Sequence, residues 1–192
     1  MAARLILASA SPRRAALLRQ AGFDPVIRPA DVDEEAIAAG HSPSEAALLL
    51  AQAKAEVVAR LFPDDLSLGA DTVVELAGKN LGKPADAQAA RQMLESLSGT
   101  THQVITGVCL LWPVRHWRRQ QKVVSTVQMR LLVPAEIQAY IAGGQWQGKA
   151  GGYGLQDADP FVVCTAGSAS NIVGLPMEVT IQLLAEAGFA SG

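Results

Sequence analysis

The chain has 192 residues, of which 49% are hydrophobic and 18% are charged, and its formal net charge at pH 7 is −2. This length and balance fit one packed domain, or one domain with two lobes, and they exclude wholesale disorder. The slight negative charge gives no basic footprint for nucleic acid, so a site for an anionic ligand would have to concentrate positive charge locally.

The predicted elements interleave strands and helices along the chain. In the first half we expect a strand at 5–8, a helix at 12–21, an extended segment at 25–29, a helix from 43 to about 61, a strand at 67–71, a hairpin at 73–82 and a helix from 87 to about 97. In the second half we expect strands at 103–112 and 121–133, a helix at 134–142, a glycine-rich loop at 148–154, a strand at 161–165, a loop at 167–171 and a helix at 176–187. This order predicts an α/β fold with a mixed sheet.

The first residues, the length of the apolar runs and the cysteines together predict the cellular compartment. The first four residues lead directly into a strand, without the features of a secretory signal, and no apolar run approaches the ~20 residues that span a bilayer. Cys109 and Cys164 lie in apolar strand-like segments, which favours buried, reduced thiols over a disulfide. We therefore expect a cytoplasmic protein with no membrane partner.

The first strand runs into a segment that is suited to phosphate binding. Ser11 stands where a helix N-cap belongs, Pro12 takes the first helical position, and Arg13 and Arg14 follow in the first turn. Cations are unfavourable at a helix N-terminus unless an anion comes to meet them. Together with the hydroxyl of Ser9, these groups describe an anion site; the alternative is a capped surface helix with two solvated arginines.

Two acidic positions are candidates for a base or for metal ligands. Asp71 is expected at the end of an apolar strand, the edge where α/β folds build active sites, although a turn-forming aspartate is the plainer alternative. The run 31–35 contains four carboxylates, of which only one, such as Glu34, needs to face a site. For a run of charges, a solvated loop or helix start is the usual alternative.

Two lysines and a glycine-rich loop complete the candidate set. Lys54 stands among alanines in the longest helix, where its side chain could extend to solvent or point across a cleft to a phosphate. Lys83 lies between Gly82 and Pro84, where the backbone is tightly specified. In the loop, Tyr153 and Gln156 offer a ring and an amide suited to reading a nucleobase, whereas the alternative is an irregular connection.

These side chains together indicate polyphosphate chemistry. Arg13, Arg14, Lys54 and Lys83 would supply cationic contacts, and Glu34 and Asp71 would supply a base or oxygen ligands. Mg²⁺ favours a site with one or two carboxylates that is completed by substrate phosphate oxygens. Such a site could activate water and stabilise charge on a transferring phosphoryl group.

Eight short motifs place the chain beside a known family. They are SASPRR (9–14), DVDE (31–34), AKA (53–55), GADTVV (69–74), GKP (82–84), LSGTTHQVITGV (97–108), AGGYGLQ (150–156) and NIVGLP (171–176). In this order and over nearly the whole length, the chain resembles the Maf family of nucleoside triphosphate pyrophosphatases. The resemblance implies one domain with two lobes over residues 1–192, a mixed sheet flanked by helices similar to the inosine triphosphatase fold, and an active site in the cleft.

The resemblance also implies a reaction and roles for individual residues. Family members hydrolyse nucleoside triphosphates to the monophosphate and pyrophosphate, need a divalent cation (Mg²⁺, Mn²⁺ or Co²⁺), and often form dimers, so a homodimer is an option here. Asp71 would be the proton acceptor and, with Glu34, a metal-associated residue. The substrate contacts would be Ser9, Arg13, Arg14, Lys54, Thr72, Lys83 and Gln156. Among these, Arg13, Thr72 and Gln156 resemble the branch of the family that acts on dTTP and UTP.

Two other classes of function compete with this interpretation. Because Maf proteins have also been linked to septum formation and cell division, a nucleotide-binding regulator with little turnover is the main alternative. A regulator needs the phosphate contacts but not the carboxylates, and the presence of both Glu34 and Asp71 favours an enzyme. A nucleic-acid-binding module is opposed by the net charge and by the lack of a basic aromatic face.

Overall fold

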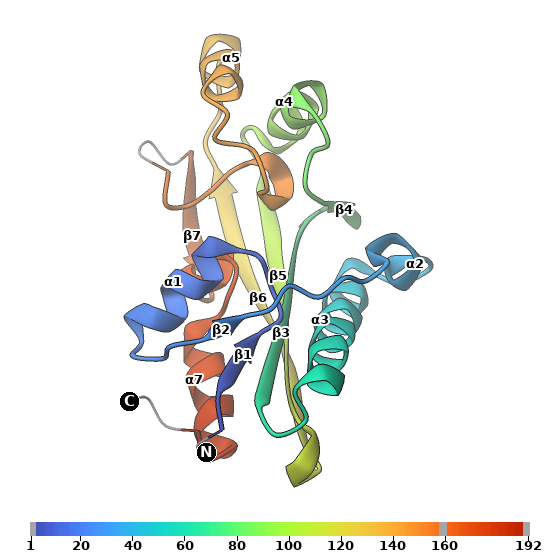
Figure 1. The fold of residues 1–192 in the computed structure, drawn as a ribbon. Coiled ribbons are helices and arrows are strands. Elements are labelled where there is room, and N and C mark those ends of the chain that lie inside the picture. Colours follow the sequence, from blue (N-terminus) through green and yellow to red (C-terminus); the bar gives the residue numbers. More distant parts are fainter. Residues whose placement is uncertain (1–2, 158–160, 190–192) are drawn as a thin grey trace.

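A seven-stranded mixed sheet organises the chain in the computed structural model, which describes residues 3–157 and 161–189 (Figure 1). The strands are β1 (Leu5–Leu7), β2 (Val26–Ile27), β3 (Leu66–Leu76), β4 (Lys79–Leu81), β5 (Thr101–Trp112), β6 (Trp117–Met129) and β7 (Val162–Ala166). Their order is β2-β1-β3-β5-β6-β7, and β4 pairs with β3. β1 is parallel to both its neighbours, and the other pairs are antiparallel.

Helices pack around the long strands. They are α1 (Pro12–Gln20), α2 (Glu34–Ala38), α3 (Pro43–Leu61), α4 (Ala87–Leu97), α5 (Pro134–Ala142), α6 (Ala169–Val173) and α7 (Met177–Glu186), with short 3₁₀ turns at Pro113–Arg115 and Ala150–Gly152. Figure 1 shows α3 on one side of the long strands and α1 and α7 on the other, while α4 and α5 lie together beyond one end. No helix in the described part of the chain is both long and apolar enough to cross a membrane.

The long strands carry two main hydrophobic clusters. One gathers around α1 and α7 and includes Leu18, Val108 and Leu184, and the other gathers around α4 and α5 and includes Leu94 and Val104. Strand β5 contributes to both clusters, so the strands connect the two ends of the molecule.

Helix α3 lies unusually close to the sheet. A Cβ atom added at Gly69 of β3 would stand 2.1 Å from the carbonyl oxygen of Ala51, and one at Gly107 of β5 would stand 2.3 Å from that of Ala47. The helix presents alanines to these glycines, so its backbone can approach the strands. A capping box between Ser42 and Glu45 begins the helix.

Most predicted elements are confirmed, because their signals are local. Ser11 caps α1 by accepting a bond from the backbone N–H of Arg14, and Asp86 caps α4 in the same way through Ala89. The class, α/β with a mixed sheet, is also confirmed. The cysteines are free thiols as expected, and Cys109 is buried.

Three expectations are wrong in detail. Asp71 does not end a strand, because pairing with β5 from Ser67 to Glu75 carries β3 through it. The segment 167–171 is not all loop, since α6 begins at Ala169; a helix of five residues is too short to show periodicity. Cys164 is only half-buried, because it lies on the edge strand β7.

We expect Gly69→Ala to destabilise the fold. The new methyl group would meet backbone atoms of α3, which cannot rotate away, so the free energy of unfolding should fall by about 1–3 kcal/mol or more. Urea unfolding measures this change. Gly82→Ala is the matched control, because a Cβ there meets nothing within 4 Å. Equal midpoints for the two variants would show that α3 does not need this close approach.

Candidate active site

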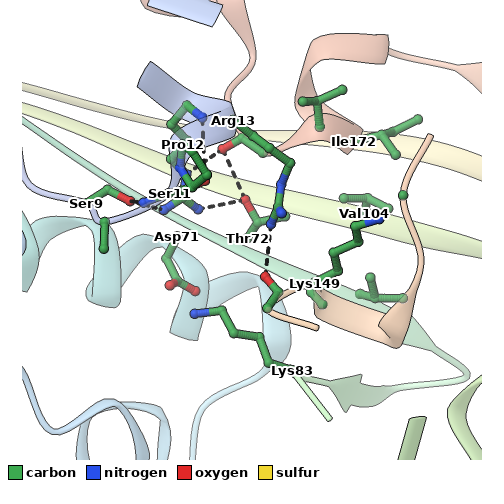
Figure 2. Close-up of a pocket in the computed structure, with 18 of the residues that line it drawn as sticks. Ser9, Ser11, Pro12, Arg13, Asp71, Thr72, Lys83, Val104, Lys149 and Ile172 are labelled. Atoms are coloured by element: carbon green, nitrogen blue, oxygen red, sulfur yellow. Dashed lines mark hydrogen bonds between the residues drawn. The ribbon is translucent and has the colours of Figure 1, made fainter. Parts of the chain in front are cut away.

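The candidate site opens along one edge of β3. On that edge, β1 pairs with β3 at 66–68 and β4 pairs with it at 74–76, while β5 occupies the other edge. Between the two pairings, the described residues place no strand beside β3. Asp71 and Thr72 lie in this gap and line a cavity of about 470 Å³ (Figure 2). The chemistry is thus placed by an interruption in strand pairing, not by a strand end.

The structure brings every predicted site residue to this one cavity. Its lining includes Ser9, Arg13, Arg14, Glu34, Lys54, Asp71, Thr72, Lys83 and Gln156. Lys149 adds a fifth basic group, against the two acidic groups Glu34 and Asp71. Positive charge is therefore concentrated here in a chain whose net charge is −2. This is the local arrangement that an anionic ligand requires.

Lys54 joins the two carboxylates. Its Nζ lies 2.6 Å from Oδ1 of Asp71 and 2.7 Å from Oε1 of Glu34, and the residue is only 6% exposed. Burial alone would raise the pKa of Glu34, but the hydrogen bond and charge of Lys54, with the charges of Lys83 and Arg14, outweigh burial and hold that pKa below its usual value. Lys54 therefore points into the site and not to solvent. Glu34 begins α2, the helix-start alternative, while its side chain faces the cavity.

Arg14 ties three parts of the chain together. Its Nε donates to the carbonyl of Gly174 at 2.8 Å, and its two terminal nitrogens donate to the hydroxyls of Ser9 at 3.0 Å and Thr72 at 3.1 Å. Burial lowers the pKa of this guanidinium. The Thr72 hydroxyl also lies 2.9 Å from that of Thr106. Among the described residues, three of the five N–H donors of Arg14 thus hold the framework, and two remain for a ligand.

Arg13 and Lys83 approach the cavity from different elements. Arg13 donates to the carbonyl of Gly148 at 2.9 Å, which links α1 to the glycine-rich loop, and burial lowers its pKa. Figure 2 shows the Lys83 side chain pointing toward the carboxylate of Asp71. The backbone N–H of Gly151 donates to the carbonyl of Gly82 at 3.0 Å, so the loop also fixes the segment that carries Lys83.

The loop residue Tyr153 lines the cavity, although little of its side chain is exposed. Its hydroxyl lies 2.6 Å from Nε2 of His102 and therefore ties the loop to β5. Gln156, by contrast, is exposed at the cavity wall, as a side chain that contacts a ligand would be.

Sequence reasoning missed one buried cluster beside the cavity. Lys149 forms an ion pair with Asp157, and the Tyr140 hydroxyl donates to the second oxygen of Asp157 at 2.6 Å. Burial, the hydrogen bond and the charge of Asp157 together raise the pKa of Tyr140. The signal in the sequence was the pair of opposite charges that flanks the glycine-rich loop.

A family model described as "Maf-like protein" matches residues 4–187. The chain belongs to the Maf family. A "dTTP/UTP pyrophosphatase" of Cereibacter sphaeroides is 48% identical over 186 residues, covering 96% of this chain and 95% of that protein. Another so named, of Rhodopseudomonas palustris, is 46% identical over 194 residues, covering 97% and 93%. A solved nucleoside-triphosphatase / dITP/XTP pyrophosphatase of Mycobacterium abscessus is 15% identical, with a TM-score of 0.46 and coverage of 96% and 97%.

The His102 contact predicts a pH dependence of stability. Burial lowers the pKa of His102 from 6.5 to about 4 in the folded chain. Between these two pH values, His102 is protonated in the unfolded chain and neutral in the folded chain. The free energy of unfolding should therefore fall as the pH drops from 6.5 to 4, by up to about 1.4 kcal/mol per pH unit.

Urea unfolding of His102→Gln across that range should give a flatter curve than that of the unaltered protein. His41→Gln, at an exposed position, is the control and should keep the original slope. Parallel curves for all three proteins would show that His102 is not the group responsible.

Proposed function

We propose that this chain hydrolyses nucleoside triphosphates to the monophosphate and pyrophosphate, with dTTP and UTP as preferred substrates. The main support is that one cavity gathers four basic groups, Arg13, Arg14, Lys54 and Lys83, with a carboxylate pair, Glu34 and Asp71, that Lys54 joins. The near-full-length similarity to proteins named dTTP/UTP pyrophosphatases supports the same reaction and substrates. A cytoplasmic homodimer that clears unwanted nucleotides is the setting we propose.

Asp71 is the proposed base. Its carboxylate would take a proton from a water molecule as the water oxygen bonds to the α-phosphorus, and the bond from that phosphorus to the bridging oxygen would break to release pyrophosphate. Lys54, 2.6 Å from Asp71, holds the carboxylate in place. In this scheme the anionic triphosphate lies against Arg13 and Lys83, whose charge-assisted bonds compensate the charge that develops.

The carboxylate pair fits a divalent cation such as Mg²⁺, Mn²⁺ or Co²⁺. Lys54 bonds to one oxygen of each carboxylate, so the other oxygen of Glu34 and of Asp71 can face a cation. The described residues contain no group of three or more His, Cys, Asp or Glu side chains placed to hold a metal, so substrate phosphates would complete the coordination, as Mg²⁺ prefers. When bound, the cation would neutralise phosphate charge and lower the pKa of attacking water.

The remaining side chains are assigned by their position. Ser9 lies in the turn before α1, and Arg14 lies within α1. Both are proposed to contact the triphosphate with their remaining hydrogen-bond donors. Gln156 is proposed to read the base, because its amide carries a donor and an acceptor, like the N3–H and O4 edge of uracil and thymine. Thr72 would influence base preference indirectly, because its hydroxyl accepts a hydrogen bond from Arg14 and so helps to position that side chain.

Asp71→Asn should reduce kcat by about 10²–10⁴-fold, the usual effect of losing a general base. The measurement is pyrophosphate release from UTP and dTTP with Mg²⁺ present. The unaltered protein should form the monophosphate and pyrophosphate together. Asp31→Asn is the control, because Asp31 is an exposed carboxylate just before α2, and this variant should stay active. Release of the diphosphate and orthophosphate would contradict the proposed reaction, and activity of Asp71→Asn within a few-fold of the original would remove Asp71 as its base.

Arg13→Ala and Lys83→Ala should damage turnover far more than stability. Each removes a charge that faces the cavity, and a charge-assisted bond to phosphate is worth about 1.5–3 kcal/mol. Steady-state kinetics and thermal unfolding should be compared on the same samples, with Arg19→Ala, an exposed arginine of α1, as the control. If the loss of activity merely follows the loss of stability, the residue concerned supports the fold and does not hold the substrate.

A further inference from the structure

The cavity has two chemically different sides. Figure 2 shows Asp71 and the tip of Lys83 on one side, and Val104, Ile172 and Lys149 on the other. If the triphosphate takes the charged side, as the proposed function requires, the apolar side is left for the base. A flat, uncharged ring suits apolar walls with a few convergent polar groups. Lys149 is then a charged side chain placed where the base would lie.

The surroundings of Lys149 differ from those of a phosphate-binding lysine. Its ammonium is paired with Asp157, and the two side chains are only 12% and 10% exposed. Tyr140 holds the carboxylate from behind with its hydroxyl, at 2.6 Å. The negative charge of Asp157 balances Lys149 and would repel a phosphate group. A balanced pair of this kind suits an uncharged hydrogen-bond acceptor on the ligand.

The glycine-rich loop is built to keep this pair in place. A Cβ at Gly154 would stand 2.9 Å from Nζ of Lys149 and 3.0 Å from Oδ1 of Asp157, so the ion pair lies directly against the Gly154 backbone. Residues 149 and 157 bracket the loop segment that carries Gln156. The pair thus fixes the position of both the ammonium and the neighbouring amide.

We propose that Lys149 is a specificity-determining residue that donates a hydrogen bond to the 4-carbonyl oxygen of uracil or thymine. This inference rests on the proposed function and deepens it. In the described contacts one of the three N–H donors of the ammonium serves Asp157, so two are available to a base. Asp157 and Tyr140 act as positioning residues through Lys149.

This role answers a question that Gln156 alone leaves open. An amide can turn over, so Gln156 could match the edge of cytosine as well as that of uracil. An ammonium has only donors and cannot adapt in this way. Cytosine carries an amino group at position 4, which would face the Lys149 donors without an acceptor between them. A site that leaves buried polar groups unpaired rejects the wrong ligand strongly.

The test compares kcat/KM for UTP, CTP and inorganic tripolyphosphate, which has no base, in Lys149→Met and the unaltered protein. The variant should lose roughly tenfold or more on UTP and little on CTP or tripolyphosphate, so that the UTP/CTP ratio falls by about tenfold or more. Lys79→Met, an exposed lysine of β4 outside the cavity, is the control and should keep the original ratio.

A second variant guards against misfolding. Lys149→Gln combined with Asp157→Asn removes both buried charges together and should fold, while still weakening the preference for UTP over CTP. Calorimetric binding of UMP and CMP to this folded variant gives a readout besides turnover, and its UMP preference should be reduced.

Equal losses on UTP, CTP and tripolyphosphate, or an unchanged UTP/CTP ratio, would overturn the role of Lys149. Those outcomes leave the proposed function standing, whereas absence of pyrophosphate release by the unaltered protein from any nucleotide would reject the proposed function itself.

Discussion

The site depends first on the ion pair between Lys54 of α3 and Asp71 of β3, which forms where the alanines of α3 and the glycines of the strands let the helix lie close to the sheet. A buried ammonium and carboxylate are costly unless each satisfies the other, so the helix and strand must be placed accurately. Gly69 provides that placement two residues before Asp71, on the same face of β3, and Gly107 lies directly opposite Asp71 on β5. The pattern that lets the helix pack is therefore the one that positions the proposed base. Glu34 then joins the pair from α2, so a second carboxylate is oriented by the same ammonium.

Strand pairing explains why there is a cavity at this point. β1 pairs with only the first three residues of β3, and the chain then leaves the sheet through Ser9 into α1. β4 covers the same edge only further on, from Val74. The uncovered stretch lines a cavity with Asp71 and Thr72 at the place that a longer β1 would have filled. Arg14 closes one flank of the gap through its bonds to Ser9, Thr72 and the Gly174 carbonyl. The cavity is thus a built feature of the topology, with its walls held by hydrogen bonds.

The sequence predicts those parts of this arrangement whose causes are local. Ser11 and Asp86 cap their helices through backbone N–H groups three residues away, so short windows suffice to find them. Most candidate residues were also identified by local patterns, such as arginines in the first turn of a helix, and all of the predicted site residues line one cavity. What short windows could not supply depends on partners distant in sequence. Asp71 lies inside β3 because β5, more than thirty residues later, continues the pairing beyond it. Likewise, the hydroxyl of Tyr153 meets Nε2 of His102, a residue of β5 that lies 51 positions earlier in the chain.

Arg13 and Arg14 show how one short motif can serve two purposes. Neighbouring residues on a helix point about 100° apart, so the two guanidinium groups leave α1 in different directions. Arg14 donates to Thr72 on β3, to Ser9 in the turn before α1 and to the carbonyl of Gly174 after α6. Arg13 instead donates to the carbonyl of Gly148, next to Lys149 in the loop. The first helical turn therefore touches both sides of the cavity. A nucleotide bound across it would be in contact with the framework that holds the proposed base, Asp71, and with the loop proposed to read the nucleobase. In the proposed function, α1 would therefore set the distance between the phosphate contacts and the base contacts, and a ligand of the wrong length would satisfy one side only.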